Sequence, residues 1–594
     1  MLLRHITFVE LAHMLERHEG SSPAPHLVDP AARKRARRTA RQNGVWERIA
    51  RDLDPTRVIP VIKRSEYRHY RRTNDRTRHQ AVEAARSREL ELAALALWLD
   101  HPKAELDYLQ DLLWAYCDDW TWVMAAHEDA SIDLGSAMRG ARLAEILHAL
   151  EDRIEPEVAG RVHCEIYRRI FRNYSNHENT EFWHTARMNW NHVCNGGVIR
   201  AALLEIGNSR VLARLIHPAI QNMTYALDGF TDDGGCEEGA GYWGFGFGHF
   251  VQAAYALHCR TGGELDIMAD EKIGRICRFP LAGHIHGTHR ASFADCRQGS
   301  VAALNALQIN RFVKLPELYE LCPRQDSGEV KGAGPLEVRD MHSLALYRNE
   351  RATGKPDPRD YLLPDLGLVK MRGSAEAGQM TVAAIAGNNG VPHSHNDVGS
   401  FLVFARGRMV LTDPGAPLYT RKTFSSRRYE ILYCRSRGHS VPVINGAEQK
   451  KGAQYRGELS AKGLNRSGTK RAMIDMTRAY PRGTVRSLVR TLELDHGANS
   501  LTIEDAYRFG KKPRRLEEAF VTFEKAALVK GGRAVRIGPA RGGVTLSAGQ
   551  PGRFSVETLA AESEDSLPGG PSLRRISFVP QKLSKDTVLR FALR

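Results

Sequence analysis

Residues 388–415 read NNGVPHSHNDVGSFLVFARGRMVLTDPG. After a His-Ser-His triplet, this stretch contains two apolar runs that an Arg-Gly-Arg turn separates. Two apolar runs on either side of a turn with Gly are typical of a β-hairpin. A hairpin brings its far end back beside its start, so we expect Asp413 to lie near His395.

The same stretch supplies side chains that bind metal ions. In an extended segment, residues i and i+2 project from the same face, so His393 and His395 can reach one site. A second block, CRSRGHSVPVING at residues 434–446, adds His439. These imidazoles and the Asp413 carboxylate suit a zinc-type centre with nitrogen and oxygen ligands. The residues alone leave a second interpretation open, in which the histidines are polar residues on a strand and Asp-Pro-Gly is a common turn.

Three blocks of this region, PHSHNDVGSF, LTDPG and RGHSVPVING, resemble the signature of the heparinase II/III-like polysaccharide lyases in content and order. The resemblance extends over residues 189–445. It implies that His393 is catalytic and that a structural Zn²⁺ is held by His395, Asp413 and His439. It also implies a fold, an incomplete α/α toroid followed by an antiparallel β-sandwich.

A block in the helical half, FWHTARMNWNHVCNGG at residues 182–197, is dense in Asn, Trp and His. Its resemblance to the family implies that an Asn here binds the carboxylate of the substrate. Asn189 is the first choice, and Asn191 and His192 are expected to bind substrate beside it. Helix capping and loop packing by Asn is the alternative that the residues leave open.

A second block, DGFTDDGGCEEGAGYWGFGFGHF at residues 228–250, surrounds acids and aromatic residues with glycines. This composition suits a sugar-binding loop, because aromatic faces stack on sugar rings and Gly permits close backbone approach. The resemblance implies that Tyr242 is catalytic. We expect Glu238, Trp243 and, from the polar passage that follows the hairpin, Tyr429 to bind substrate.

The expected reaction is β-elimination on a uronic-acid-containing glycan, which leaves a 4,5-unsaturated uronate. Asn189 would stabilise the charge that develops on the carboxylate, as in an oxyanion hole. A base must accept the C5 proton and an acid must protonate the departing oxygen, and Tyr242 and His393 fill these two roles. Which of them is the base stays open.

Two other functions compete with this hypothesis. A glycoside hydrolase on an α/α toroid would use paired carboxylates, for which Asp232, Asp233, Glu237 and Glu238 are candidates. That interpretation leaves the histidine set unexplained. A non-catalytic polyanion-binding protein with structural histidines ranks third.

Composition and periodicity divide the chain into four regions. Residues 1–75 are basic and irregular. Over residues 76–330, apolar positions recur at spacings of three and four, which predicts an all-α domain of antiparallel helices. Residues 331–360 are rich in Gly, Pro and charge and predict a linker. Residues 361–594 alternate short apolar segments with turns, which predicts an antiparallel β-sandwich.

The 594 residues include 85 Lys and Arg against 69 Asp and Glu, a formal net charge of +16. Such a charge favours polyanions as partners. The sequence carries no recognised DNA- or RNA-binding motif, so we expect an acidic polysaccharide or oligosaccharide rather than nucleic acid. A basic surface that only faces solvent is the alternative.

No run of about 18 or more apolar residues occurs, so we expect no transmembrane helix and no membrane partner. The first residues, MLLRHITFVELAHMLERHEG, carry charges among their apolar positions, unlike the apolar core of a secretory signal, and we expect a short helix there instead. Nine cysteines stand singly along the chain, which argues against a disulfide framework. We therefore expect a cytoplasmic location if the first Met is the native start, and a periplasmic or secreted one if it is not.

Overall fold

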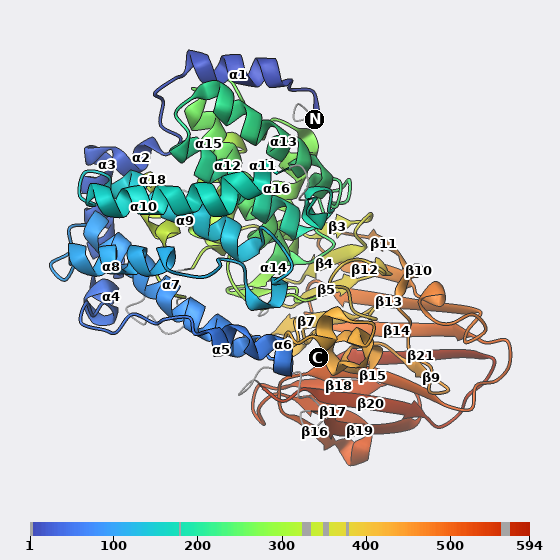
Figure 1. Cartoon of the computed structure of the whole chain (residues 1–594). Helices are drawn as coiled ribbons and strands as arrows, with labels where there is room; N and C mark the ends of the chain where they lie inside the picture. The colour runs from blue at the N-terminus through green and yellow to red at the C-terminus, as the bar shows by residue number, and fades with distance from the viewer. Residues whose placement is uncertain (1–3, 177–179, 324–333, 349–355, 376–378, 560–570) are drawn as a thin grey trace. The chain divides into compact units, whose positions relative to one another are not determined.

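The computed structural model describes residues 4–176, 180–323, 334–348, 356–375, 379–559 and 571–594. The chain forms two compact units, each assembled from three segments (Figure 1). Unit 1 comprises Met1–Gly229, Trp243–Cys277 and Val301–Lys355, and unit 2 comprises Phe230–Tyr242, Arg278–Ser300 and Pro356–Arg594. The division therefore differs from the predicted boundaries, because two segments inside residues 76–330 belong to the second unit.

Unit 1 is helical. Its helices are α1 (Phe8–Arg17), α2 (Pro25–Val28), α3 (Pro30–Gln42), α4 (Val45–Asp52), α5 (Arg64–Tyr67), α6 (His69–Thr73), α7 (Thr77–Trp98), α8 (Leu106–Cys117), α9 (Leu134–Leu150), α10 (Pro156–Ile166), α11 (Arg172–Ser175), α12 (Asn189–Glu205), α13 (Ser209–Leu227), α15 (Gly248–Arg260), α17 (Ala303–Phe312) and α18 (Val338–Leu346). The boundary between the units falls within α16 (Glu271–Gly283).

Helix α12 packs against α9, α13 and α15. Two adjacent glycines allow two of these contacts to be close. A Cβ at Gly197 would lie 2.7 Å from the Ala137 carbonyl oxygen of α9, and one at Gly196 would lie 2.9 Å from the His249 carbonyl oxygen of α15. Any larger side chain would therefore push the helices apart. The two adjacent glycines of this block thus serve helix packing.

The short helix predicted in the first residues is confirmed as α1, but the prediction that the rest of residues 1–75 is irregular was wrong. Helix α1 begins at a capping box in which Thr7 and Glu10 satisfy each other's backbone N–H groups. In α3, Ala32, Ala36 and Ala40 are buried at a spacing of four between the Arg and Lys residues. Ala carries little weight in a hydrophobic pattern, so the basic residues conceal a helix with one buried face.

The predicted linker at residues 331–360 also contains a helix. Helix α18 packs against α3, α7 and α17 of unit 1. Its first turn is stabilised by a capping box between Glu337 and Asp340. Residues 331–333 and 349–355 lie outside the described residues.

Unit 2 is built mainly of antiparallel sheets. In spatial order, a five-stranded sheet consists of β3 (Tyr361–Leu363), β4 (Leu368–Arg372), β5 (Thr381–Ile385), β7 (Phe401–Ala405) and β8 (Arg408–Leu411). In the same order, an eight-stranded sheet consists of β11 (Glu458–Lys462), β12 (Thr469–Asp475), β13 (Ser487–Asp495), β14 (Ser500–Arg508), β21 (Asp586–Leu593), β18 (Val544–Ala548), β17 (Ala534–Ile537) and β16 (Ala526–Val529). A four-stranded sheet consists of β19 (Gly552–Thr558), β20 (Arg574–Pro580), β15 (Leu516–Thr522) and β9 (Val443–Ile444), and β10 (Gly452–Arg456) pairs with β6 (Asn388–Asn389).

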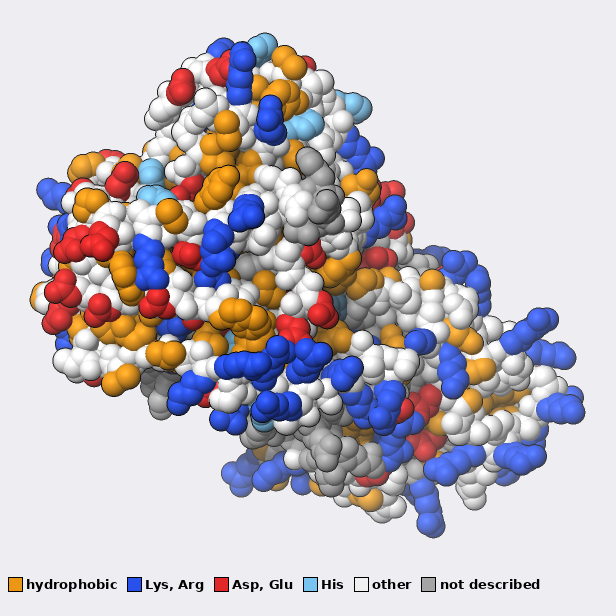
Figure 2. Space-filling model, viewed as in Figure 1, with side chains coloured by type: hydrophobic (Ala, Val, Ile, Leu, Met, Phe, Trp, Pro, Cys, Tyr) orange, Lys and Arg blue, Asp and Glu red, His pale blue; other side chains and the backbone are white. Residues whose placement is uncertain are grey.

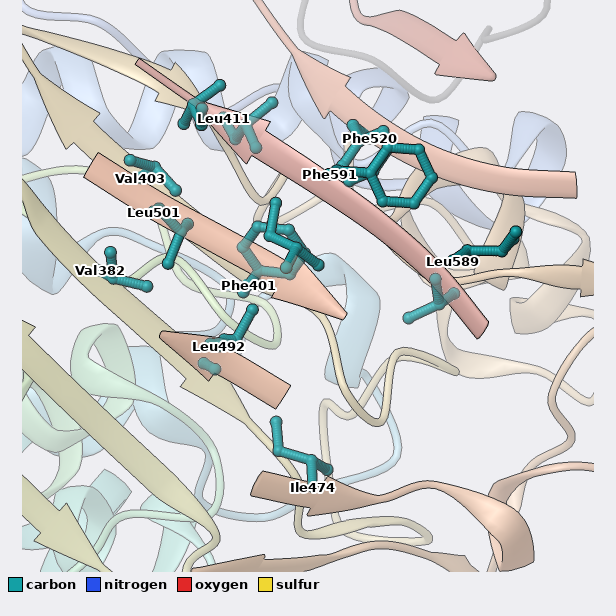
Figure 3. Close-up of a cluster of buried hydrophobic side chains, with 14 of the residues drawn as sticks. Val382, Phe401, Val403, Leu411, Ile474, Leu492, Leu501, Phe520, Leu589 and Phe591 are labelled. Atoms are coloured by element: carbon teal, nitrogen blue, oxygen red, sulfur yellow. The ribbon is translucent and has the colours of Figure 1, made fainter. Parts of the chain in front are cut away.

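One continuous apolar core joins these sheets (Figure 3). Phe401 of the five-stranded sheet, Phe520 of the four-stranded sheet and Leu492 of the eight-stranded sheet are fully buried in it. Along β13, buried and less buried residues alternate, as expected for a strand with one face in a core. Sheets that share a core through their inner faces form a sandwich, so the predicted antiparallel β-sandwich is confirmed.

The predicted hairpin is strands β7 and β8, which pair in antiparallel register through Val403↔Leu411 and Ala405↔Arg408. The turn between them has positive φ at Arg406 (52°) and Gly407 (76°). Asp413 follows β8 after one residue, so the hairpin fixes where this carboxylate lies.

Among the described residues, no helix combines the length and apolar character that crossing a membrane requires. On the face drawn in Figure 2, many Lys and Arg side chains project from the strand-rich part of the chain. This distribution agrees with the excess of basic residues in the sequence.

Candidate active site

His395, Asp413 and His439 come together in unit 2, as the hairpin predicted. All three are buried, and one potential ligand atom from each lies within 4.8 Å of the other two. His439 Nδ1 is 2.9 Å from Asp413 Oδ2, and the rings of His395 and His439 are 5.1 Å apart. The prediction that Asp413 returns to the vicinity of His395 is therefore confirmed.

The chemistry of this set fits a cation. His395 Nδ1 is buried and has no hydrogen-bond partner among the described residues. The other ring nitrogens already have partners, because His395 Nε2 lies 2.9 Å from Asp295 Oδ1 and His439 Nε2 lies 2.9 Å from the Tyr433 carbonyl oxygen. With both Nε2 atoms engaged, the Nδ1 atoms of the two rings face the Asp413 carboxylate side of the set, where His439 Nδ1 contacts Asp413 and would turn to an ion if one were bound, the arrangement typical of metal-binding histidines.

The charges around His395, Asp413 and His439 also favour a bound cation. Burial raises the pKa of Asp397, and the neighbouring Asp413 carboxylate adds to this shift. Burial alone would lower the pKa of His439, but Asp413 and Asp397 outweigh it and raise that pKa to about 9. Two buried carboxylates beside these imidazoles form a site that favours a positive charge.

The Asp295 carboxylate, which sequence reasoning missed, joins this set to His393. Its Oδ2 is 2.8 Å from His393 Nδ1 and accepts from the Tyr419 hydroxyl at 3.2 Å. Its Oδ1 is 2.9 Å from His395 Nε2 and accepts from Arg428 Nη2 at 2.8 Å. His393 and His395 do reach one group, but from a turn in which His393 has φ of 61° rather than from an extended strand.

Asp295 is held as a carboxylate. Burial alone would raise its pKa, but the hydrogen bonds of His393 and His395 and the charges of His395 and Arg428 hold that pKa well below its usual range. An ionised carboxylate can only accept hydrogen bonds, so His393 donates from Nδ1, and in the neutral imidazole the lone pair is therefore on Nε2.

Tyr242 lies directly against His393. The two rings are stacked with centroids 4.1 Å apart, and the Tyr242 hydroxyl is 2.6 Å from the Tyr419 hydroxyl. Burial raises the pKa of Tyr242 well above its usual value, although the Tyr419 hydrogen bond opposes this shift. His393 Nε2 lies 3.6 Å from Glu238 Oε1, so this predicted substrate-binding residue does border the pair. Tyr429 is near as well, with its hydroxyl 3.4 Å from Ser394 Oγ.

Three of the other predicted substrate-binding residues serve the interior of unit 1. Trp243 is 1% exposed and donates its indole N–H to the Ile276 carbonyl oxygen, so its ring has no face free for a sugar. Asn191 is fully buried and donates to the His184 and Asn222 carbonyl oxygens.

His192 is likewise buried within unit 1. Its ring is 1% exposed, and Nε2 lies 3.1 Å from the Met223 carbonyl oxygen. Asn191 and His192 thus bond α12 to neighbouring segments of unit 1, and Trp243 bonds to α16, so none of the three is placed to bind substrate. Asn189 begins α12 and is 5% exposed, and its role stays a prediction.

The carboxylates proposed for a hydrolase have different surroundings. Asp233 accepts from the backbone N–H of Asp365 at 2.8 Å and from the Thr231 hydroxyl, so it holds two loops together. Asp232 is exposed. Burial and the neighbouring Glu238 raise the pKa of Glu237. Of the four candidates, Glu238 is the one that borders the Tyr242–His393 pair.

Solved structures share this fold over most of the chain. A crystal structure of heparinase III gives a TM-score of 0.61 at 12% identity and covers 95% of this chain and 93% of that one. The heparan sulfate lyase HepC from Pedobacter heparinus gives a TM-score of 0.56 at 12% identity and coverages of 98% and 87%. The chondroitin AC lyase of Streptomyces coelicolor A3, in complex with chondroitin sulphate, gives 0.50 at 12% identity and coverages of 99% and 82%.

These likenesses confirm the predicted fold class, an incomplete α/α toroid followed by an antiparallel β-sandwich. Residues 355–575 match the family model described as heparinase II/III-like, C-terminal. A search of curated proteins finds no significant match.

Proposed function

We propose that this chain, whose residues 355–575 match the family model described as heparinase II/III-like, C-terminal, cleaves uronic-acid-containing acidic glycans by β-elimination. The observation that carries the proposal is the Tyr242–His393 pair, whose stacked rings are 4.1 Å apart. The pair combines a phenol and an imidazole, two groups that can exchange protons with a substrate. The excess of Lys and Arg favours an acidic substrate.

His393 acts as the base in this mechanism. Because Nδ1–H is donated to Asp295, the lone pair on Nε2 is free to take the C5 proton of the uronate. The electrons of the C5–H bond then form the C4–C5 double bond, and the bond from C4 to the glycosidic oxygen breaks. Glu238, at 3.6 Å from Nε2, helps to hold the imidazolium that results.

Tyr242 acts as the acid. Its raised pKa keeps the phenol protonated near neutral pH, so it can give its proton to the departing glycosidic oxygen. For a substrate of the opposite C5 configuration, the C5 proton lies on the other face of the ring. Tyr242 then reacts as the phenolate, after losing its proton to solvent, and it takes the C5 proton and passes that same proton to the departing oxygen. The Tyr419 hydroxyl, 2.6 Å away, orients the phenol in either case.

We further propose a structural Zn²⁺ at His395, Asp413 and His439. The orphaned Nδ1 of buried His395 and the nearby Asp413 carboxylate support this assignment. When bound, the ion would cross-link the hairpin to the segment that carries His439 and so fix the turn that presents His393.

The reaction predicts a particular product. Incubation with heparan, chondroitin, hyaluronan, alginate and related acidic glycans should yield, for the natural substrate, products that absorb in the ultraviolet. The absorbance comes from the conjugated double bond that elimination leaves. Because elimination adds no water, the masses of the two products of one cleavage should add up to the mass of the intact glycan. Chromatography with ultraviolet detection and mass spectrometry measure both properties.

Products that are one water heavier and lack the absorbance would establish the glycoside hydrolase instead, with Glu237 and Glu238 as its first candidates. Binding of the glycans without any product would establish the non-catalytic alternative.

Asn189→Ala should lower turnover more than binding. Charge on the substrate carboxylate grows in the transition state, so a hydrogen bond to it is strongest there. We expect kcat to fall by about 100-fold or more with KM nearly unchanged. Steady-state kinetics on the substrate found above test this. The matched control is Asn310→Ala in α17, whose amide donates to the Ala306 carbonyl oxygen of the same helix and to the Leu315 carbonyl oxygen just after it. A rise in KM with unchanged kcat would contradict the role given to Asn189.

A further inference from the structure

We infer that Asp295 is the positioning residue of the proposed lyase reaction: one buried carboxylate fixes the tautomer of His393 and, through Tyr419, the orientation of Tyr242. The inference rests on the proposed function. It adds Asp295 and Tyr419 to a site whose sequence signature contains neither of them.

Each oxygen of the Asp295 carboxylate accepts two hydrogen bonds, and together they fix the orientation of the side chain. Oδ2 accepts from His393 Nδ1 at 2.8 Å and from the Tyr419 hydroxyl at 3.2 Å. Oδ1 accepts from His395 Nε2 at 2.9 Å and from Arg428 Nη2 at 2.8 Å. The side chain has no exposed surface, so water cannot substitute for any of these donors.

The backbone holds the carboxylate in place as well. The Asp295 N–H donates to the His393 carbonyl oxygen at 3.2 Å. Together with the side-chain hydrogen bond, this makes two hydrogen bonds between the two residues. Ala294, which precedes Asp295, has φ of 61°, in the left-handed region that is unfavourable for Ala. Strain of this kind persists where the surrounding contacts impose it, and it is frequent at active sites.

A chain of hydrogen bonds follows from this geometry. It runs from the Tyr242 hydroxyl through the Tyr419 hydroxyl and the Asp295 carboxylate to His393 Nδ1. Both proposed catalytic groups are therefore oriented by one carboxylate. Because all the members lie in unit 2, their arrangement depends on the fold of that unit alone.

The geometry makes Asp295→Asn a sharp test. Each carboxylate oxygen faces two donors, and an amide must turn its NH₂ group toward one of the two pairs. If NH₂ faces His393, that ring must accept at Nδ1 and carry its proton on Nε2, where the base needs a lone pair. If NH₂ faces Arg428 and His395, two donors oppose it, which makes this orientation the less favourable one.

We expect Asp295→Asn to lower kcat by about 100-fold or more while KM changes little, since a wrong tautomer blocks proton transfer and leaves binding intact. With substrate deuterated at C5, the ratio of the rates for hydrogen and deuterium should rise relative to wild type, because proton abstraction becomes more rate-limiting. Zinc content is measured in the same samples, so that loss of metal is recognised.

The control is Asp360→Asn. Asp360 is also a buried carboxylate of unit 2, and it accepts from the backbone N–H of Arg372 at 2.7 Å and from Lys470 Nζ at 2.7 Å. Its loss should lower thermal stability without changing kcat or the isotope effect. Equal kcat values for Asp295→Asn and wild type would overturn the inference.

If Asp295→Asn does not fold, Tyr419→Phe tests the same chain of hydrogen bonds. Tyr419→Phe keeps the ring and removes only the hydroxyl between Tyr242 and Asp295, and we expect kcat to fall by roughly 10-fold. Full activity of this variant would overturn the chain of hydrogen bonds. If wild type itself forms no unsaturated product, the proposed function fails; if it does and these variants match it, the inference alone fails.

Discussion

Replacing Tyr242 with Phe is expected to lower kcat by about 100-fold or more while substrate still binds. The change keeps the aromatic ring that stacks on His393 at 4.1 Å and removes only the hydroxyl. That hydroxyl carries the proton that the mechanism delivers to the departing glycosidic oxygen. Because binding of the glycan uses other contacts, KM should change much less than kcat. Steady-state kinetics at several substrate concentrations separate the two.

The matched control for this variant is Tyr480→Phe. Tyr480 is a buried tyrosine of the same unit that donates its hydroxyl to the Pro442 carbonyl oxygen at 2.6 Å. Its loss should cost about 1 kcal/mol of stability and leave kcat unchanged. If Tyr242→Phe proves fully active on the natural substrate, the lyase assignment of this loop is wrong, and Glu237 and Glu238 become the residues to replace next.

The part of the site that sequence predicted best is the part that local geometry determines. A hairpin must return to its start, so the closeness of Asp413 to His395 follows from two apolar runs and a turn. The resemblance supplied the roles of Tyr242 and His393, and the structure brings these two together.

Asp295 could not be found in this way. It lies 98 residues before His393, in the loop sequence SFADC, and no pattern in that loop indicates a partner elsewhere. The polar passage after the hairpin was predicted to contribute Tyr429, but the residues of this passage that bond to Asp295 are Tyr419 and Arg428. Which of its many Arg, Ser and Tyr residues point inward depends on tertiary packing, which composition does not encode.

The errors in the helical half have one physical cause. An Asn or Trp near the start of a helix looks the same in sequence whether it faces a ligand or the core. Asn191 and Trp243 donate to backbone carbonyl oxygens inside unit 1, and burial rather than residue type distinguishes the two cases. Helix α3 was missed for a related reason, because the alanines that it buries are small.

His439→Ala should remove the metal and destabilise the protein together. His439 is fully buried and donates from Nδ1 to Asp413 at 2.9 Å, so its loss leaves a buried carboxylate without its partner, next to Asp397. Without an ion, breaking a buried ion pair in this way costs about 3–5 kcal/mol. With zinc bound, Nδ1 is a ligand rather than a donor to Asp413, and the variant instead loses the stabilisation that the metal supplies. Elemental analysis and thermal unfolding of the same preparation measure both effects.

His393→Ala is the control that separates the two histidine roles. In the proposed site the His393 ring donates to Asp295 and acts on the substrate, and it is not a zinc ligand. This variant should therefore lose turnover and keep about one zinc per chain. His395→Ala should lose zinc. Wild type purified without chelators and free of metal would refute the zinc site; the stability loss of His439→Ala would then reflect the buried His439–Asp413 pair alone, because that contact exists without an ion.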